Sequence, residues 1–288
     1  MPTDQPLPGM QPTGMPSPGM PSPATPSSPD ARPSQPSLRV FYGGTFDPVH
    51  AGHLAMAEAA AVALGVPVRL MPAADPPHRA VPGADAGHRA AMLDLAVQGQ
   101  PMLRVDRREL QREGRSYTIR TLHELRAQYG ADAPLAFVIG ADSLRALHTW
   151  KDWRDLLEGA HLVVAERPGS PLDDLAQEEA SGPDAAAASA TQGDPALREA
   201  LSGRWADTPE ALRQRPGGRV LRLRQPLHPA SATAIRRAIA AGEADWARWL
   251  VPAVADYIRR HRLYGARPAD AAAPEGPLSS GPSGAPAV

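Results

Sequence analysis

The sequence contains no cysteine, so neither a disulfide framework nor a thiolate metal site can form. Its 30 Lys and Arg residues nearly balance its 31 Asp and Glu residues, which leaves a formal net charge of -1. This balance gives no electrostatic reason to expect binding to nucleic acid or to a membrane. No apolar run approaches the roughly 18 residues that span a bilayer, and no basic region precedes an apolar core at the N-terminus. We therefore expect a soluble, cytoplasmic protein without a signal peptide.

Proline-rich and alanine-rich stretches divide the 288-residue chain. Residues 1–37 hold 12 of the 34 prolines. They carry too little apolar surface to offset the entropy of ordering, so we expect a disordered extension. Residues 267–288, rich in Ala, Pro, Gly and Ser, are expected to form a second disordered tail. Residues 38–266 then form one domain, interrupted by a variable Ala-rich loop at about 172–217.

Strand-like and helix-like segments alternate through this domain. Strands are expected at residues 38–44, 66–72, 102–106, 135–140, 161–167 and 219–224, and helices at residues 53–65, 87–99, 116–130, 231–242 and 251–265. This alternation indicates an α/β fold with a Rossmann-like, doubly wound and mainly parallel sheet and helices on both faces. Ligands of such sheets bind at the carboxyl ends of the strands, near the point where the strand order reverses.

One motif lies where this fold binds its ligand. The segment GGTFDPVHAGH, residues 43–53, follows the first expected strand and opens the first expected helix. Gly43 and Gly44 have no Cβ, so the phosphates of a ligand can approach the backbone there. His50 and His53 are three residues apart, so they share a face of a helical turn.

Three interpretations of the paired histidines remain open. A plain strand-turn-helix junction would carry them incidentally. A zinc site would need a third and a fourth ligand, and the chain has neither an HExxH motif nor cysteine. A phosphate site would direct two imidazoles and free backbone N–H groups at a phosphoryl group, at a helix N-terminus. Gly52, between the histidines, would then let a nucleotide base or ribose pack against the helix.

A second motif, SATAIRRAI, begins at Ser231 and combines hydroxyl side chains with arginine. Ser231 and Thr233 precede an apolar periodic run, which is typical of a helix N-terminus. One interpretation is a helix cap followed by exposed Arg236 and Arg237. The other is an anion site made by the two hydroxyls, the free backbone N–H groups and Arg236. The presence of the first motif favours the anion site.

Two polar segments could bind a second, acceptor molecule. The segment DPPHR, residues 75–79, has prolines that stiffen a loop, and His78 with Arg79 could reach a phosphate. The segment SYT, residues 116–118, opens an expected helix, where free backbone N–H groups favour a carboxylate. Taken alone, the residue types of the first segment favour a polar surface loop.

Asp142 and Trp150 add to the acceptor candidates. Asp142 follows the most strand-like run of the chain, so its carboxylate could accept hydrogen bonds from ribose hydroxyls in the ligand crevice. It could equally cap the next short helix. Trp150 offers an indole for stacking on an aromatic ring, although tryptophan at such spacing is more often part of a core. We expect Trp153 in the core.

The segment GGTFDPVHAGH closely resembles the signature of the nucleotidyltransferase superfamily that carries a paired-histidine His-x-Gly-His motif. Within that superfamily, the chain looks most like the bacterial nicotinate-nucleotide adenylyltransferases. The resemblance covers residues 38–265 apart from the Ala-rich loop. It implies transfer of the adenylyl group of ATP to nicotinate mononucleotide, which gives nicotinate adenine dinucleotide (deamido-NAD) and pyrophosphate in NAD biosynthesis.

The resemblance also assigns roles to particular residues. His50 and His53 would be catalytic and would act on phosphate charge. The ATP-binding residues would be Gly43, Gly44, Thr45, Phe46, Gly52, His53, Ser231, Thr233 and Arg236. The acceptor-binding residues would be His78, Arg79, Tyr117, Thr118, Asp142, Trp150 and Lys151. The chain departs from the family's Ser-Ser-Thr-x-Ile-Arg type of motif at Ala230 and Ala232, where Ile and Ser are common, so one hydroxyl is lost.

The implied partners are ATP and nicotinate mononucleotide, with no nucleic acid and no membrane. Mg²⁺ would be bound through the ATP phosphates, so we expect no dedicated metal site made by the protein. Related adenylyltransferases that act on nicotinamide mononucleotide or on phosphopantetheine are the nearest alternatives. A nucleotide-sensing module without catalysis and a metallohydrolase that uses the paired histidines are alternatives from other classes.

Overall fold

Seven parallel strands form one sheet in the computed structural model, in the order β3-β2-β1-β4-β5-β7-β6. The structure describes residues 37–76, 82–165, 172, 194–225 and 228–267. The strands are β1 (Arg39–Gly44), β2 (Val68–Pro72), β3 (Leu103–Val105), β4 (Leu135–Gly140), β5 (His161–Ala165), β6 (Trp205–Ala206) and β7 (Val220–Leu223). The parallel, doubly wound sheet expected from the sequence is therefore confirmed.

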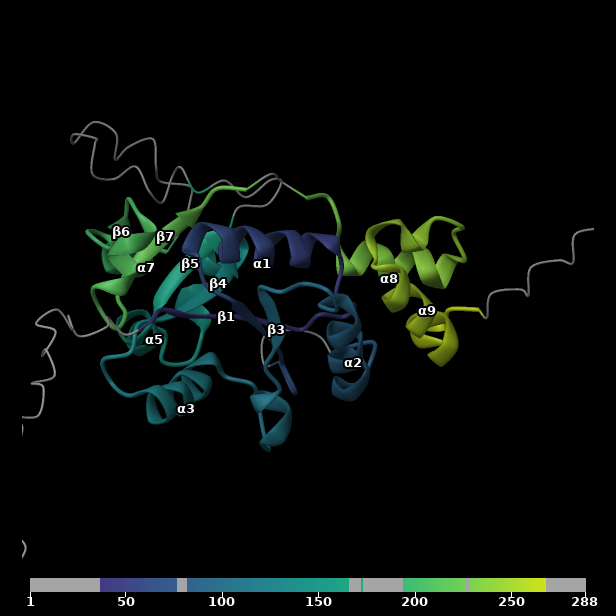
Figure 1. Cartoon of the computed structure of the whole chain (residues 1–288), viewed down its shortest axis with the longest axis horizontal. Helices are drawn as coiled ribbons and strands as arrows, with labels where there is room; N and C mark the ends of the chain where they lie inside the picture. Colours follow the sequence, from purple (N-terminus) through teal and green to yellow (C-terminus); the bar gives the residue numbers. More distant parts are fainter. Residues whose placement is uncertain (1–36, 77–81, 166–171, 173–193, 226–227, 268–288) are drawn as a thin grey trace, which may run out of the picture. The chain divides into compact units, whose positions relative to one another are not determined.

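Helices connect these strands (Figure 1). The α-helices are α1 (Ala51–Leu64), α2 (Ala86–Ala96), α3 (Thr118–Tyr129), α4 (Ala141–Arg145), α5 (Trp153–Gly159), α7 (Pro195–Leu201), α8 (Ala232–Ala241) and α9 (Pro252–His261). Short 3-10 helices are η1 (Arg108–Gln111), η2 (Leu147–Thr149), η4 (Pro209–Arg213), η5 (Trp246–Trp249) and η6 (Leu263–Gly265). Among the described residues, no helix is long and apolar enough to cross a membrane.

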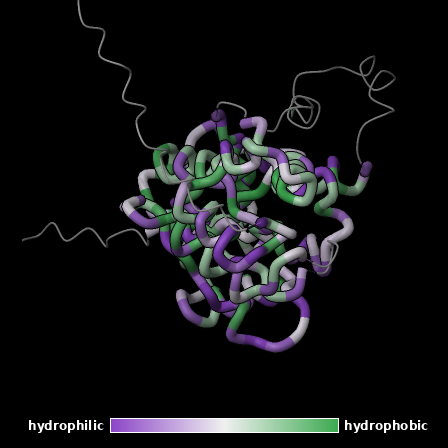
Figure 2. Tube along the Cα trace, turned by 90° about the vertical axis from the view of Figure 1, so that its right-hand side faces the viewer, coloured by the Kyte–Doolittle hydropathy of each residue, from purple (hydrophilic) through white to green (hydrophobic). Residues whose placement is uncertain are grey.

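The sheet is covered on both faces because its strands alternate their side chains. In β1, Val40 and Tyr42 belong to a buried cluster with residues of α1, α2, α8 and α9. Phe41, between them, belongs to a second cluster with residues of α3, α4, α5 and α7. Figure 1 shows α1 on one side of the sheet and α3 and α5 on the other. Hydrophobic segments run through the interior of this arrangement, with hydrophilic segments around them (Figure 2).

The strand order reverses between β1 and β4. β2 pairs with one edge of β1, and β4 pairs with the opposite edge. The carboxyl ends of these two strands, at Gly44 and Gly140, therefore flank the crevice in which doubly wound sheets bind their ligands. The first motif follows β1 directly, and Asp142 follows β4 within two residues.

The structure corrects the expectation of a loop at about 172–217. Within that stretch, residues 194–217 include α7, β6 and η4. Helix α7 has strong start signals: Pro195 stands in its first turn, and the Asp194 side chain accepts a hydrogen bond from the backbone of Leu197 at 3.0 Å. Residues 173–193 lie outside the described residues, as do residues 1–36 and 268–288, which make up nearly all of the segments 1–37 and 267–288 that we expect to be disordered.

Candidate active site

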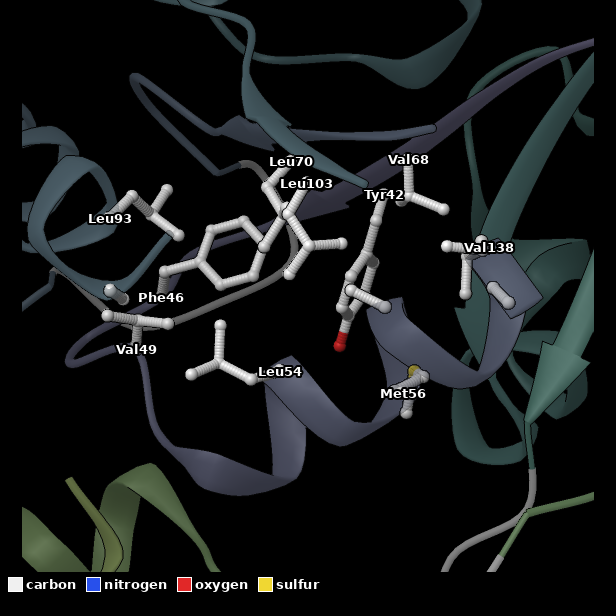
Figure 3. Packing of buried hydrophobic residues seen from close by; sticks show 14 of the residues in the cluster. Tyr42, Phe46, Val49, Leu54, Met56, Val68, Leu70, Leu93, Leu103 and Val138 are labelled. Carbon is white, nitrogen blue, oxygen red and sulfur yellow. The ribbon is translucent and has the colours of Figure 1, made fainter. Parts of the chain in front are cut away.

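The turn that follows β1 is fixed by a buried aromatic ring. Phe46 has a left-handed backbone with φ of 51°, which is unusual for a bulky residue and costs about 1–3 kcal/mol. Its ring is only 1% exposed and meets the Tyr42 ring edge-on, with 5.4 Å between the centroids. Figure 3 shows the Phe46 ring among the side chains of Leu93 and Leu54. Burial of this ring therefore holds the strained turn in place.

His50 and His53 stack on each other where α1 begins. Their ring centroids are 3.7 Å apart, and the ring planes differ by 26°. His50 is the N-cap residue of α1, and its backbone N–H donates to Nδ1 of His53 at 3.3 Å. Because Nδ1 of His53 accepts this hydrogen bond, it carries no proton itself. The neutral ring therefore has its proton on Nε2. Nε2 is thus the atom from which His53 can donate to a ligand.

Phe46 also sets the position of this histidine pair. Its ring meets the His53 ring edge-on, with 5.1 Å between the centroids. His50 is buried, at 4% exposure, whereas His53 is half-buried. The first turn of α1 has backbone N–H groups that no helical carbonyl can pair, and these form a site suited to an anion beside the imidazoles.

The three glycines of the motif have different surroundings. A Cβ on Gly43 would meet no atom within 4 Å, so the backbone there faces open space, as a phosphate cradle needs. A Cβ on Gly44 would lie 2.9 Å from the Phe46 ring. A Cβ on Gly52 would lie 3.2 Å from the His50 ring and 3.4 Å from Nδ1 of His228. This corrects our expectation for Gly52, because two imidazoles occupy the space that we assigned to a base or ribose.

The second motif lies against the first. Ser231 caps α8, as predicted, and its Oγ accepts a hydrogen bond from the backbone of Ala234 at 3.5 Å. Arg236 reaches from α8 to the β1–α1 turn, where its Nη1 donates to the backbone oxygen of Asp47 at 2.6 Å. Its Nη2 lies 3.4 Å from Oγ1 of Thr233. The fold thus brings together two motifs that are far apart in the sequence.

Asp47 connects several segments of the site through hydrogen bonds, a role that the sequence analysis did not predict. Its buried carboxylate accepts hydrogen bonds from the backbone N–H groups of Gly83 at 2.8 Å and Ala84 at 3.1 Å, and from the Tyr264 hydroxyl at 2.8 Å. The Arg236 guanidinium lies 3.5 Å from the same carboxylate. Burial raises the pKa of Tyr264, and the negative charge of Asp47 raises it further, so the hydroxyl remains a donor.

Arg89 of α2 is a second residue that the sequence did not reveal. It is 1% exposed, and its guanidinium donates to the backbone oxygens of Thr45 at 2.7 Å, Ala84 at 3.1 Å and Ala74 at 3.2 Å. Burial lowers the pKa of Arg89, while the negative charge of Asp47 opposes that effect. The side chain therefore ties the β1–α1 turn to both ends of the segment that contains DPPHR.

The acceptor segments are partly brought together. Ser116 does not open α3 as expected, because its Oγ accepts hydrogen bonds from the backbones of Ala74 at 2.9 Å and Asp75 at 3.3 Å. The backbone of Ser116 also donates to the oxygen of Asp75 at 2.8 Å. The start of DPPHR therefore lies beside the SYT segment. His78 and Arg79 themselves lie outside the described residues.

The remaining acceptor candidates lie at the start of α3, in α4 and in the segment before α5. Tyr117 is the N-cap residue of α3, directly before Thr118, and Nζ of Lys151 lies 5.3 Å from the centre of its ring. Trp150 is half-buried against the cluster under α3 and α5. Asp142 is exposed in α4, beyond the end of β4. Trp153 is buried, which confirms its place in the core.

Comparison with known proteins agrees with this arrangement. Residues 41–238 match the model of the family described as cytidylyltransferase-like. A protein of Stenotrophomonas maltophilia (strain K279a), named "Probable nicotinate-nucleotide adenylyltransferase", is 53% identical over 233 residues, covering 79% of this chain and 97% of the relative. A protein of the same name from Xylella fastidiosa (strain 9a5c) is 46% identical over 234 residues, covering 80% and 97% respectively.

A solved structure shows the same fold. The nicotinic acid mononucleotide adenylyltransferase of Plasmodium falciparum, in complex with NaAD, aligns with a TM-score of 0.56 at 14% sequence identity. The alignment covers 79% of this chain and 97% of that one. The family match, the sequence identities and the motif geometry agree. The chain belongs to the nicotinate-nucleotide adenylyltransferases, within the cytidylyltransferase-like family.

Proposed function

We propose that this chain transfers the adenylyl group of ATP to nicotinate mononucleotide, giving nicotinate adenine dinucleotide and pyrophosphate in NAD biosynthesis. The observation that carries the proposal is the stacked pair of His50 and His53 at the start of α1, with Arg236 of α8 held against the same turn. Two imidazoles, a guanidinium and the N-terminus of a helix all favour phosphate. The names of the relatives support nicotinate mononucleotide as the acceptor.

The reaction needs positioning and charge stabilisation rather than a protein nucleophile. An oxygen of the acceptor phosphate attacks the α-phosphorus of ATP in line, and the bond from that phosphorus to the bridging oxygen breaks, so pyrophosphate leaves. His53 donates from Nε2 to the α-phosphate, and His50 supports it from the stacked position. Loss of one such donor typically lowers the rate by about 10²- to 10³-fold.

Arg236 and Gly43 are placed to bind the β- and γ-phosphates of ATP. Arg236 is half-buried, and its guanidinium forms a rigid fork that matches phosphate oxygens. The space beside Gly43 is open, so a phosphate can approach the backbone closely. Ser231 and Thr233, at the start of α8, add hydroxyl groups next to this fork. Together these groups hold the part of ATP that leaves as pyrophosphate.

Mg²⁺, which the family implies, would be held mainly by phosphate and water oxygens. The carboxylate of Asp47, three residues before His50 in the sequence, already accepts from two backbone N–H groups and a tyrosine hydroxyl. In the described part of the chain, no three His, Asp or Glu side chains are grouped so as to hold a metal. When bound, the ion neutralises charge on the phosphates, which the protein complements through His50, His53 and Arg236.

Residues around the start of α3 would select the acceptor. The backbone N–H groups at Tyr117 and Thr118, at a helix N-terminus, suit the nicotinate carboxylate. Lys151, the only lysine of the chain, adds positive charge beside the Tyr117 ring. Trp150 would stack on the pyridine ring, and Asp142 would bind the ribose hydroxyls. We further propose that His78 and Arg79 bind the acceptor phosphate, and that the enzyme acts in the cytoplasm.

An acceptor panel tests the proposal. Nicotinate mononucleotide, nicotinamide mononucleotide and phosphopantetheine are each supplied with ATP and Mg²⁺, and both pyrophosphate release and the mass of the dinucleotide product are measured. We expect the highest kcat/KM with nicotinate mononucleotide. A preference for either of the other acceptors would contradict the acceptor assignment. Absence of pyrophosphate release with all three would contradict adenylyl transfer itself.

A further inference from the structure

Arg69 is an unexpected residue in the interior of the sheet. It stands in β2, which pairs with β1 on one side and with β3 on the other. Strands of parallel sheets that are covered on both faces are normally apolar throughout, as Val68, Leu70 and Met71 are here. The guanidinium carbon of Arg69 lies 5.8 Å from the centre of the Phe41 ring. The Arg69 side chain is half-buried, so its charge is only partly solvated and a nearby anion would stabilise it.

The Arg69 guanidinium has unused hydrogen-bonding capacity. Within the described part of the chain it makes no hydrogen bond and no ion pair. Its two arginine neighbours differ in this respect. Arg108 forms a two-pronged pair with Asp106, at 3.0 and 2.7 Å, and donates to Gln128 at 3.1 Å. Arg107 is paired with Asp94.

These side chains line a hollow of about 460 Å³. It lies between β3, η1 and the last turn of α3, and its lining consists of one valine and the polar residues Arg69, Arg107, Arg108, Asp106, Gln111 and Gln128. Of its three guanidinium groups, those of Arg107 and Arg108 are paired with Asp94 and Asp106, so the positive charge of the hollow comes from Arg69.

Two of these cations approach the same aromatic ring. The guanidinium carbon of Arg108 lies 5.7 Å from the centre of the Phe41 ring, close to the corresponding distance for Arg69. Asp106 forms an ion pair with Arg108, whereas none of the described carboxylates pairs with Arg69. An anion between the two guanidinium groups would lower their mutual repulsion and fill the donor positions of Arg69.

We propose that this hollow binds a compact oxyanion, namely inorganic phosphate or pyrophosphate, with Arg69 as its principal binding group. The guanidinium fork matches two oxygens of a tetrahedral anion, and the amides of Gln111 and Gln128 can donate to the others. No lining residue is aromatic, so the hollow has no ring on which a nucleobase could stack. This favours a small inorganic anion over a nucleotide.

The site is separate from the proposed acceptor site. Gln128, in the hollow, and Thr118, at the start of α3, are ten residues apart on the same helix. At the rise of an α-helix this separation is about 15 Å. The inference therefore concerns a second anion site and does not depend on the reaction that the chain catalyses.

Equilibrium dialysis with radiolabelled phosphate, and in a second arm with pyrophosphate, tests this inference on the full-length chain. Arg69→Gln should weaken one site per chain about tenfold or more, as expected for the loss of a charge-assisted bond, while any binding at the histidine motif remains. Arg39→Gln is the matched control, because Arg39 also lies in a strand and over an aromatic ring, that of Tyr129, but outside the hollow. Equal stoichiometry and affinity in Arg69→Gln and in the unmutated chain would overturn the proposal.

A second measurement uses only the unmutated chain, so its result does not depend on whether the Arg69→Gln variant folds. The anion that binds should protect Arg69, but not Arg39, from an arginine-specific dicarbonyl reagent, as read by peptide mass spectrometry. Protection by phosphate would identify that ion as a ligand, and protection by pyrophosphate alone would identify the product ion. Modification of Arg69 at an unchanged rate with both ions would also overturn the proposal.

Discussion

Nη1 of Arg236 donates to the backbone oxygen of Asp47 at 2.6 Å, which ties the start of α8 to the turn that holds the paired histidines. The carboxylate of the same aspartate binds the backbone at Gly83 and Ala84 and the hydroxyl of Tyr264. One buried residue thus connects the histidine turn, the segment after DPPHR, α8 and the end of η6. We infer that the two phosphate-binding motifs are held in register by Asp47.

Arg236 should contribute mainly to ATP binding. We expect Arg236→Met to raise KM for ATP by about 10- to 100-fold, because a charge-assisted hydrogen bond is worth roughly 1.5–3 kcal/mol. Arg237→Met is the control, since Arg237 is exposed on the same helix and makes no hydrogen bond or ion pair within the described part of the chain. Steady-state kinetics with varied ATP would measure both variants, and an equal KM for the two would contradict the assignment.

Tyr264 should stabilise the fold through its bond to Asp47. Tyr264→Phe removes the hydroxyl that donates a hydrogen bond to the buried carboxylate of Asp47. We expect the free energy of unfolding to fall by about 1.5–3 kcal/mol. Urea denaturation at neutral pH would measure this change. A loss below about 0.5 kcal/mol, the range typical of substitutions away from such features, would show that Asp47 does not need this donor.

Gly43 and Gly44 should respond differently to the same substitution. Gly44→Ala places a Cβ 2.9 Å from the Phe46 ring, so we expect a loss of stability of about 1–3 kcal/mol from overpacking. Gly43→Ala meets no atom within 4 Å, so its thermal midpoint should hardly change. If a phosphate approaches Gly43, however, KM for ATP should rise in that variant. Unchanged ATP kinetics in Gly43→Ala would place the triphosphate elsewhere.

His161 should make stability depend on pH. It is fully buried; its Nδ1 accepts from the backbone of Arg219 at 3.1 Å, so its Nε2 carries the proton and donates to the oxygen of Arg215 at 2.9 Å. Burial lowers the pKa of His161, and so the unfolded chain takes up a proton first as the pH falls. This contribution to stability is complete above the ordinary histidine pKa of about 6.5 and is lost progressively below it.

The matched variant is His161→Gln, whose amide can make both hydrogen bonds without titrating. Between pH 7 and about pH 5, the unmutated chain should lose stability more steeply than this variant, because the remaining histidines are common to both. Urea denaturation at several pH values would compare them. Parallel stability curves for the two proteins would contradict the role of His161.

The sheet and most of its helices could be predicted because they depend on local periodicity. The apolar runs of β1 and β4 and the periodic faces of α3 and α8 lie within short windows of sequence. The first and last residues of the helices were predicted less accurately than the presence of the helices, since tertiary contacts shift where a helix begins and ends. Ser116 has the hydroxyl of a helix cap, yet it binds the backbone of Ala74 and Asp75 instead, so α3 begins at Thr118. Helix α1 begins at Ala51, directly after His50.

The site was predictable only where its residues form a continuous motif. His50 and His53 are three residues apart in the chain, so their proximity followed from spacing alone. The contacts of Asp47 with Arg236 and Tyr264 join residues 189 and 217 positions apart, and no local pattern indicates them. Arg89 carries a weak signal, a charge in α2, but two of its backbone acceptors, Thr45 and Ala74, lie 44 and 15 residues away in the sequence.

The most direct test of adenylyl transfer at the paired histidines is the rate of ATP-dependent pyrophosphate release by His53→Ala, with nicotinate mononucleotide and Mg²⁺ present. We expect a fall in kcat of about 10²- to 10³-fold with an unchanged circular dichroism spectrum. His123→Ala serves as the control, because His123 is an exposed residue of α3. Full activity in His53→Ala would contradict the account.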